Sequence, residues 1–187
     1  EAAKGGHLKT LRWLHSHNFL EEWHPYICTQ AASMGRLPVL KWLLDQNPPA
    51  PFHVKAMMVS AKSGYLDIIK WAREENNPKL PWCEGVCYDA AQYGQLEVLQ
   101  WVRSQDPPCP WDEKVCKFAS LHGHLHILKW VRSQDPPCPW DENVCILAAR
   151  KKFIDILLWL QQVPDAPWVP EVCDPVLKMA LQKPARN

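Results

Sequence analysis

The chain has 187 residues, of which 47% are hydrophobic, and its 21 Lys and Arg nearly balance its 20 Asp and Glu. This apolar fraction is typical of a chain that buries a core, and a net charge of +1 gives no electrostatic attraction for nucleic acid or an anionic membrane. No apolar run reaches the roughly 18 residues that a membrane-spanning helix needs, so we expect no membrane insertion.

An internal repeat runs through the chain. A tryptophan series with a period of 29 or 30 residues consists of Trp13, Trp42, Trp71, Trp101, Trp130 and Trp159. A second aromatic series follows about ten residues behind it, at Trp23, Phe52, Trp82, Trp111, Trp140 and Trp168. The same register holds Gly6, Gly35, Gly64, Gly94 and Gly123, with Lys152 in the sixth place. Several residue types that share one period identify a repeat array.

The first unit is partial, because the opening "EAAKGGHL" matches the middle of later units. We predict one repeat domain over residues 1–187, with units at 1–17, 18–46, 47–75, 76–105, 106–134, 135–162 and 163–187. A start inside a repeat indicates a longer array or a larger assembly. Without a signal peptide at the start, an intracellular, cytoplasmic location is expected, although a lost targeting segment leaves other compartments open.

The unit at 106–134 shows the first of two helices expected in each repeat. Asp112 is a favourable N-cap residue, and Glu113 favours the positive end of the helix dipole. Small residues recur at helical spacing as far as Gly123, which supplies the left-handed conformation that ends a helix. A first helix of about ten residues is therefore predicted.

A second helix is expected directly after this glycine. Its broad apolar face is formed by Leu125, Ile127, Leu128, Trp130 and Val131. A proline or an acidic residue often stands in its first turn in other units, namely Pro38, Asp67, Glu97 and Asp155. Both residue types are favourable there, because a first-turn amide has no acceptor within the helix and the dipole attracts negative charge.

The stretch "QDPPCPW" joins one helix pair to the next, at 105–111 and again at 134–140. Consecutive prolines cannot donate to a β-ladder and disfavour helix in the residue before them. We therefore predict an extended, polyproline-like connector whose Trp packs between adjacent units. The predicted fold is an all-α solenoid of stacked helix-turn-helix repeats with Pro-rich extended connectors.

The helix pair "AAQYGQLEVLQWVRSQ" at 90–105 resembles the ankyrin repeat in its small-residue pair, its Gly, the Leu two positions later and its apolar second helix. The likeness covers about six units. The usual Thr-Pro-Leu-His opening is replaced by "KVCK" at 114–117 and "NVCI" at 143–146, and the period is shorter than the usual 33 residues. The chain thus looks like a divergent subgroup with Pro-Cys-Pro-Trp connectors and without the family's β-hairpins. The resemblance implies protein–protein recognition without catalysis.

Cysteines follow the repeat register, so they suggest no disulfide framework. One helical position holds Cys28, Cys87, Cys116, Cys145 and Cys173, and the connectors hold Cys83, Cys109 and Cys138. We expect reduced thiols that act as small apolar residues, with oxidation of some of them left open.

A zinc site could be drawn from Cys109, Cys116, His122, His124 and His126. The two cysteines are too widely spaced for a typical zinc motif, and the next unit has no corresponding histidines, so we expect no metal and no other cofactor. A Cys nucleophile would lack a fixed His partner in both copies of the connector. An enzyme and a small-molecule substrate are therefore not expected.

Aromatic side chains interleaved with Lys and Arg could also stack nucleic-acid bases. However, Trp101 and Trp130 share the apolar helix pattern of Leu99 and Leu128, which favours a buried seam between repeats. A nucleic-acid-binding helical repeat therefore stays an alternative function. Another alternative is a permanent structural subunit of a large multiprotein complex.

Candidate partner-binding positions are those that vary while the repeat frame is constant. In ankyrin repeats the two residues before the helix-ending Gly face the concave groove, which implies here Ser33, Met34, Lys62, Ser63, Gln92, Tyr93, Leu121, His122, Arg150 and Lys151. Variable positions near the starts of first helices add Lys55, Lys114 and Asn143. Merely solvated side chains would vary in the same way. The predicted function is a scaffold or adaptor that binds another protein through its concave face.

The last unit departs from the frame. Lys152 replaces the Gly, at a cost of about 1 kcal/mol if the left-handed conformation is kept, and Pro170 and Pro175 interrupt the segment that follows. A C-terminal capping repeat with a polar outer face explains these changes, and a docking end for a larger assembly is the alternative.

Overall fold

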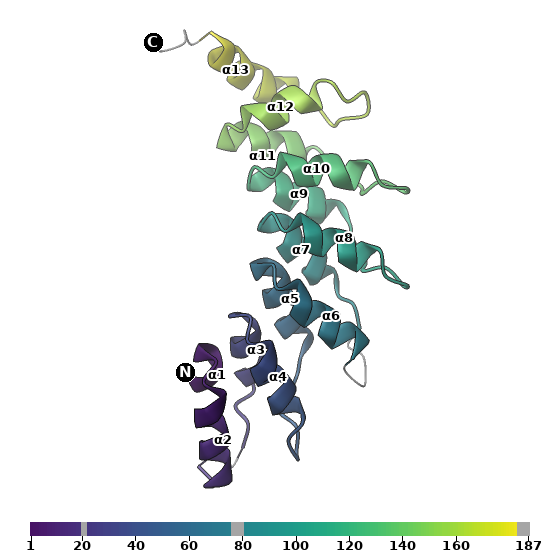
Figure 1. Cartoon of the computed structure of the whole chain (residues 1–187). Coiled ribbons are helices and arrows are strands. Elements are labelled where there is room, and N and C mark those ends of the chain that lie inside the picture. Colours follow the sequence, from purple (N-terminus) through teal and green to yellow (C-terminus); the bar gives the residue numbers. More distant parts are fainter. Residues whose placement is uncertain (20–21, 76–80, 183–187) are drawn as a thin grey trace. The chain divides into compact units, whose positions relative to one another are not determined.

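A computed structural model describes residues 1–19, 22–75 and 81–182, which form thirteen helices and no strand (Figure 1). The helices are α1 (Ala2–Gly5), α2 (Leu8–Ser16), α3 (Ile27–Ala32), α4 (Leu37–Leu44), α5 (Val54–Ser63), α6 (Leu66–Glu74), α7 (Glu84–Gln92), α8 (Leu96–Arg103), α9 (Glu113–Leu121), α10 (Leu125–Arg132), α11 (Asn143–Lys151), α12 (Ile154–Leu160) and α13 (Pro170–Leu181). The predicted all-α class is confirmed. The start of the unit predicted at 76–105 and the end of the unit at 163–187 lie outside the described residues.

Two compact units make up the chain. The N-terminal unit comprises Glu1–Ala90 with Glu97–Pro110, and the C-terminal unit comprises Ala91–Leu96 with Trp111–Asn187. The predicted single repeat domain over 1–187 and its unit limits stay a prediction.

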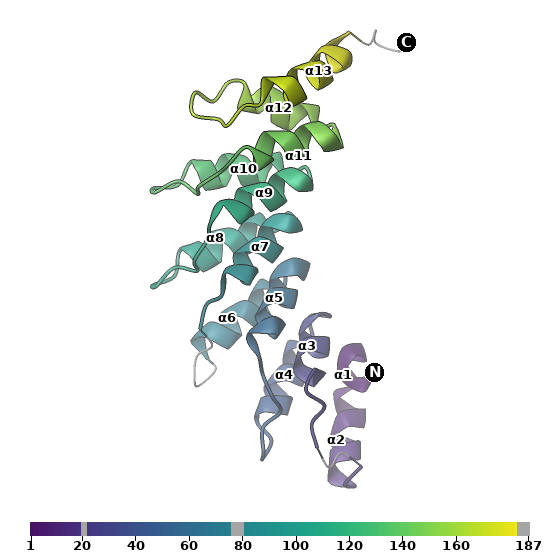
Figure 2. The same ribbon diagram turned by 180° about the vertical axis from the view of Figure 1, so that it is seen from behind.

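Within each unit, short helices alternate between two rows. In the N-terminal unit α3 packs on α1 and α5 and also on its own second helix, α4. In the C-terminal unit α11 packs on α9 and α13 and on α12 (Figures 1 and 2). In both examples a first helix is held by its own second helix and by the first helices next to it.

The two rows bury different side chains. First helices bury small residues, such as Ala31 and Ala32 in α3, which let neighbouring helices approach closely. Second helices bury large ones, such as Ile127 and Leu128 in α10. At about 25 cal/mol per Å² of apolar surface removed from water, this shared core is the main stabilising term, and neither helix of a pair buries its face alone.

Helix limits in the repeat at 106–134 agree with the prediction. Asp112 has an extended backbone at φ −140°, and its side chain accepts a hydrogen bond from the Lys114 amide at 2.9 Å, so it caps α9. Gly123 ends the turn with φ 78°. Pro38 stands in the first turn of α4, as expected. Lys152 keeps the left-handed conformation of the glycines it replaces, with φ 61° and ψ 36°.

The connectors at 105–111 and 134–140 begin in bends, which the proline pattern did not reveal. Ser104 to Pro107 form bends, and the Cys109 amide then returns to donate a hydrogen bond to Val102 O at 2.9 Å. The Arg103 guanidinium donates to Cys109 O at 2.6 Å. The Val102 carbonyl at the end of α8 is thereby satisfied, and residues from Pro108 onward run without regular secondary structure to the next helix.

The connector aromatic of each repeat packs against the tryptophan of that repeat's second helix. Ring centroids are 5.6 to 6.2 Å apart in Trp23–Trp42, Phe52–Trp71, Trp82–Trp101, Trp111–Trp130 and Trp140–Trp159. Two of these connector rings also reach the following connector, because Trp23 Nε1 donates to Pro48 O at 2.8 Å and Trp82 Nε1 to Pro107 O at 2.9 Å. The expected packing of these tryptophans between successive connectors is confirmed there.

The tryptophans of the second helices are less buried than their registration with leucine indicated. Leu99 and Leu128 are fully buried, whereas Trp101 and Trp130 are half-buried and Trp13 is 53% exposed. Residues two apart on a helix point in nearly opposite directions, so the leucines face the core while the tryptophans lie at its edge. Trp71, 7% exposed, is the most buried of this series.

Candidate protein-binding surface

The predicted binding residues lie at the two ends of the first helices. We define the turn edge as four residues in each repeat: the two residues before the left-handed residue, the left-handed residue itself, and the residue after it. In the C-terminal unit the turn edge consists of Gln92, Tyr93, Gly94, Gln95, Leu121, His122, Gly123, His124, Arg150, Lys151, Lys152 and Phe153. The second group, Lys55, Lys114 and Asn143, lies at the opposite helix ends, roughly 10 Å or more away along a helix of this length.

In the N-terminal unit the turn edge exposes both apolar and polar side chains. Met34 is 41% exposed, and Lys62 and Ser63 are also exposed. Ser33 is half-buried, and its hydroxyl donates to Gln30 O at 2.8 Å within the same helix. The Ser33 hydroxyl is therefore already bonded to a carbonyl of α3.

Residues near the starts of first helices are held by their local surroundings. The Lys55 ammonium lies 5.4 Å from the centre of the Tyr26 ring. Lys114 Nζ lies 3.3 Å from Asp112 Oδ2. The Asn143 side-chain amide donates to Asp141 Oδ2 at 2.7 Å, which ties this residue to its own connector.

Aromatic and imidazole rings line the turn edge of the C-terminal unit. The Tyr93 and His122 rings are stacked with centroids 6.5 Å apart, and His122 and His124 are stacked at 6.4 Å. His124 Nε2 donates to Gln92 O at 2.9 Å, joining two repeats. Sequence reasoning chose Tyr93 and His122 but missed His124, although its place directly after a helix-ending glycine was visible.

The environment of His124 disfavours its charged form. Burial lowers the pKa of its imidazole, and the neighbouring rings of His126 and His122 lower it further. The hydrogen bond to Gln92 O opposes these effects without cancelling them. His124 is therefore neutral at pH 7, and its ring acts as a packing and hydrogen-bonding group.

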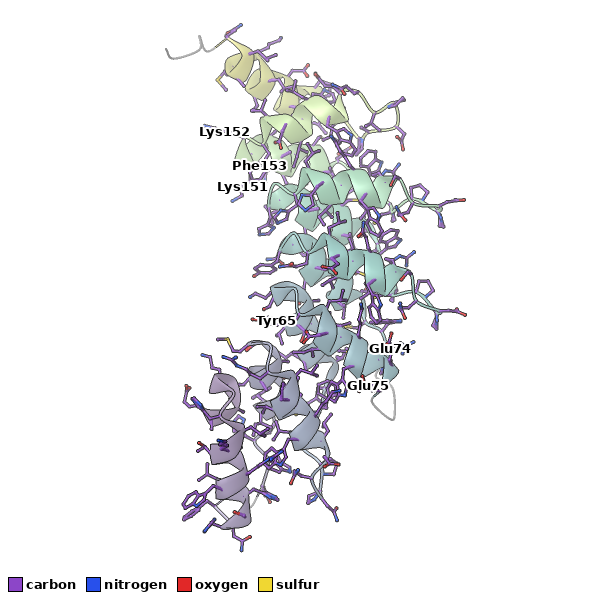
Figure 3. The ribbon with its side chains drawn as sticks, viewed as in Figure 1. Tyr65, Glu74, Glu75, Lys151, Lys152 and Phe153 are labelled. Atoms are coloured by element: carbon purple, nitrogen blue, oxygen red, sulfur yellow. The ribbon has the colours of Figure 1, made fainter. Side chains whose placement is uncertain are left out.

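Three consecutive cations close the turn edge of this unit. Arg150, Lys151 and Lys152 are all exposed, and in the described part of the chain none of them forms an ion pair. Figure 3 labels Lys151 and Lys152 at this edge. Arg150 and Lys151 belong to the last turn of α11, whereas Lys152 follows the helix. Their charge is thus directed to solvent.

An apolar groove lies beside these cations. It has a volume of 330 Å³ and is lined by Lys152, Ile154, Val176, Met179 and Ala180. Its far wall belongs to α13, which packs on α11 and α12. Met179 is 60% exposed, so part of this wall is open to water.

The zinc ligands considered in the sequence analysis do not come together in the structure. Among the described residues, no three His, Cys, Asp or Glu side chains lie together as a metal ion requires. All eight cysteines are free thiols. The hydrogen bond with Cys138, together with burial, raises the pKa of Cys116, and burial raises the pKa of Cys28 to about 12. Such thiols are protonated at neutral pH and are poor nucleophiles.

Stacked helix pairs with a left-handed residue between the two helices define a helical repeat protein. Residues 1–44 match the family model for ankyrin repeats (many copies), which confirms for this stretch the resemblance found in the sequence. Proteins of this kind generally mediate protein–protein interaction. No curated protein matches the chain. Within the described residues, no helix is both long and apolar enough to cross a membrane.

Proposed function

We propose that the chain is a non-enzymatic scaffold or adaptor that binds another protein along its turn edges and the concave face beside them. The observation that carries this proposal is the contrast between the constant buried positions of the repeat and its variable turn-edge positions. The first helices bury the same small residues in successive repeats, while the positions next to the left-handed residue differ in size and charge and reach solvent. A repeat protein that distinguishes its partners needs this arrangement of a constant frame with variable exposed side chains.

Site-specific photo-crosslinking tests this proposal. A benzophenone amino acid replaces Ser63 in one sample and His122 in another, and each protein is incubated with extract from its native source. The matched control places the same group at Lys129, which is exposed on a second helix. One protein crosslinked from Ser63 and His122, and absent from the Lys129 sample, supports the proposal. Equal crosslinking from all three positions contradicts it.

The alternative of a permanent structural subunit has one observation in its favour. In the first helix pair, Trp13 and Phe19 are 53% and 64% exposed, and their rings stack with centroids 5.7 Å apart. Exposed aromatic surface of this kind is typical of contacts that stay buried in an assembly. Size-exclusion chromatography of the native protein distinguishes the two, because a permanent subunit elutes only with its complex.

Binding of nucleic acid by the tryptophan series has less support. The Arg73 guanidinium lies 4.8 Å from the centre of the Trp82 ring and the Arg132 guanidinium 4.0 Å from the centre of the Trp140 ring, so one face of each of these two connector rings is already occupied. A base-stacking platform needs free ring faces and a basic groove.

A further inference from the structure

The turn edge of the C-terminal unit has an unbalanced charge. At the end of α11 it carries three consecutive cations, Arg150, Lys151 and Lys152, and no turn-edge position of this unit is Asp or Glu. Six of the nine acids of the same unit stand in the connectors or at the starts of first helices, at Asp112, Glu113, Asp135, Asp141, Glu142 and Asp165. The other three are Asp155 in the first turn of α12 and Glu171 and Asp174 in α13. Within one small unit, positive charge therefore collects at one edge.

Helix stability explains only part of this charge. Arg150 and Lys151 lie in the last turn of α11, where cations stabilise the negative end of the helix dipole. Lys152 lies beyond the helix, in a left-handed conformation that glycine adopts with less strain. Its side chain makes no hydrogen bond or ion pair with any residue that the structure describes. A lysine there is explained better by a ligand than by the fold.

The cations and the apolar groove form one continuous surface. Lys152 belongs to both, because it lines the groove together with Ile154 of α12 and Met179 of α13. Phe153 follows directly and covers Gly123, the residue after His122. From the groove, the edge continues over the stacked rings of His122 and Tyr93.

We propose that this edge of the C-terminal unit binds an acidic peptide, with carboxylates against Arg150, Lys151 and Lys152 and one apolar side chain in the groove between α12 and α13. This inference rests on the proposed function and names the chemistry of the partner segment. Charge complementarity argues for an acidic segment, and the groove argues for an apolar residue within it. The stacked rings of Tyr93 and His122 offer a surface for the rest of the peptide.

Charge distribution favours a peptide over nucleic acid. Affinity for nucleic acid grows with the number of phosphates neutralised, and this edge offers a run of only three permanent cations. The groove beside Lys152 is lined mainly by apolar side chains, which suit an apolar residue of a peptide better than a phosphate group.

Fluorescence anisotropy with a labelled probe peptide tests the inference. The probe alternates Glu and Ser around a central Leu, and it is titrated with the whole chain at about 0.05 M and about 0.5 M salt. We expect binding that weakens with salt. The double variant Arg150→Gln/Lys151→Gln should bind at least about fivefold more weakly, since it loses two ion pairs. The matched control Lys117→Gln/Lys129→Gln removes the same charge elsewhere in the unit and should change binding less than about twofold.

The groove is tested separately with Ala180→Phe, which fills it. This variant should weaken binding of the Leu probe but leave binding of a probe with Ser in place of Leu unchanged. Circular dichroism verifies that each variant is folded. An Arg150→Gln/Lys151→Gln variant that binds as well as the control variant would overturn the inference, as would an Ala180→Phe variant that affects both probes equally.

Two further outcomes separate this inference from the proposed function. If oligo-dT binds more tightly than the acidic probe and displaces it, the edge is a polyanion site and the peptide inference fails. If a protein is crosslinked from Ser63 while the acidic probe does not bind, the inference fails and the scaffold function stands.

Discussion

The ring of Phe153 lies directly over Gly123, so that a Cβ on this glycine would stand 2.8 Å from Phe153 Cε1. The same relationship recurs one or more repeats earlier. Arg36 covers Gly6, Tyr65 covers Gly35, and His124 covers Gly94, with closest approaches of 2.7 to 3.0 Å. In these four cases the residue after a left-handed position packs on the left-handed glycine of the preceding repeat.

Replacing Gly123 with Ala should destabilise the chain by about 1–3 kcal/mol, because a β-carbon meets both an unfavourable φ of 78° and the Phe153 ring. Urea denaturation followed by circular dichroism measures the loss. In the double variant Gly123→Ala/Phe153→Ala the steric part should disappear while the backbone part stays. Strict additivity of the two single variants would contradict the proposed contact.

The opposite change at the equivalent position, Lys152→Gly, should stabilise the chain by up to about 1 kcal/mol. Lys152 adopts the left-handed conformation at φ 61°, and it lies in the last helix pair, followed by the single helix α13. Glycine removes the strain there without losing a hydrogen bond. The midpoint of urea denaturation should rise, and an unchanged or lower midpoint would show that the lysine side chain contributes to folding.

Substitution of Arg132 should cost about 1–3 kcal/mol, more than an exposed ion pair would predict. Its guanidinium donates to Cys138 O at 2.6 Å, pairs with Asp165, and lies 4.0 Å from the centre of the Trp140 ring. Arg132→Lys should recover little, because an ammonium cannot reproduce the planar stacking and two-sided donation. Asp165→Asn serves as a control that removes only the exposed partner, and it should cost less than about 1 kcal/mol.

Stability should fall on acidification through the histidine range. The pKa of His124 is lowered in the folded chain, so the unfolded chain binds a proton first as the pH decreases. The stabilisation is therefore complete above the ordinary pKa of about 6.5 and is lost as the pH falls from there toward the lower folded value. Urea midpoints at pH 7.5 and pH 5.5 should differ more for the native chain than for His124→Asn. Equal differences would exclude His124 as the group responsible.

Local patterns in the sequence were sufficient for the helix limits. Asp112, Glu113 and Gly123 act through their own backbone or the adjacent turn, so their positions predicted where α9 begins and ends. The register also put Lys152 in the place of the helix-ending glycine, and the structure shows that it keeps the left-handed conformation. Such effects reach no further than a few residues, which is why one sequence suffices to recognise them.

The candidate site was predicted less completely. Tyr93, His122, Arg150 and Lys151 were chosen by their place before the left-handed residue, and the structure locates them at a common edge of the C-terminal unit. Asn143 was chosen too, but its side-chain amide donates a hydrogen bond to Asp141 Oδ2 in its own connector. The connector bend was also missed, since the return of the Cys109 amide to Val102 depends on a hydrogen bond that proline composition does not encode.

The sequence by itself determined the repeat, its two helices and the residue that turns between them, because period, capping and backbone preference are properties of neighbours along the chain. Only the tertiary structure decided that Phe153 covers Gly123, that the tryptophans lie at the edge of the core, and that α12 and α13 leave a groove beside Lys152. Those contacts join residues roughly twenty to thirty positions apart, and their geometry depends on how neighbouring helices pack, which no single stretch of sequence specifies.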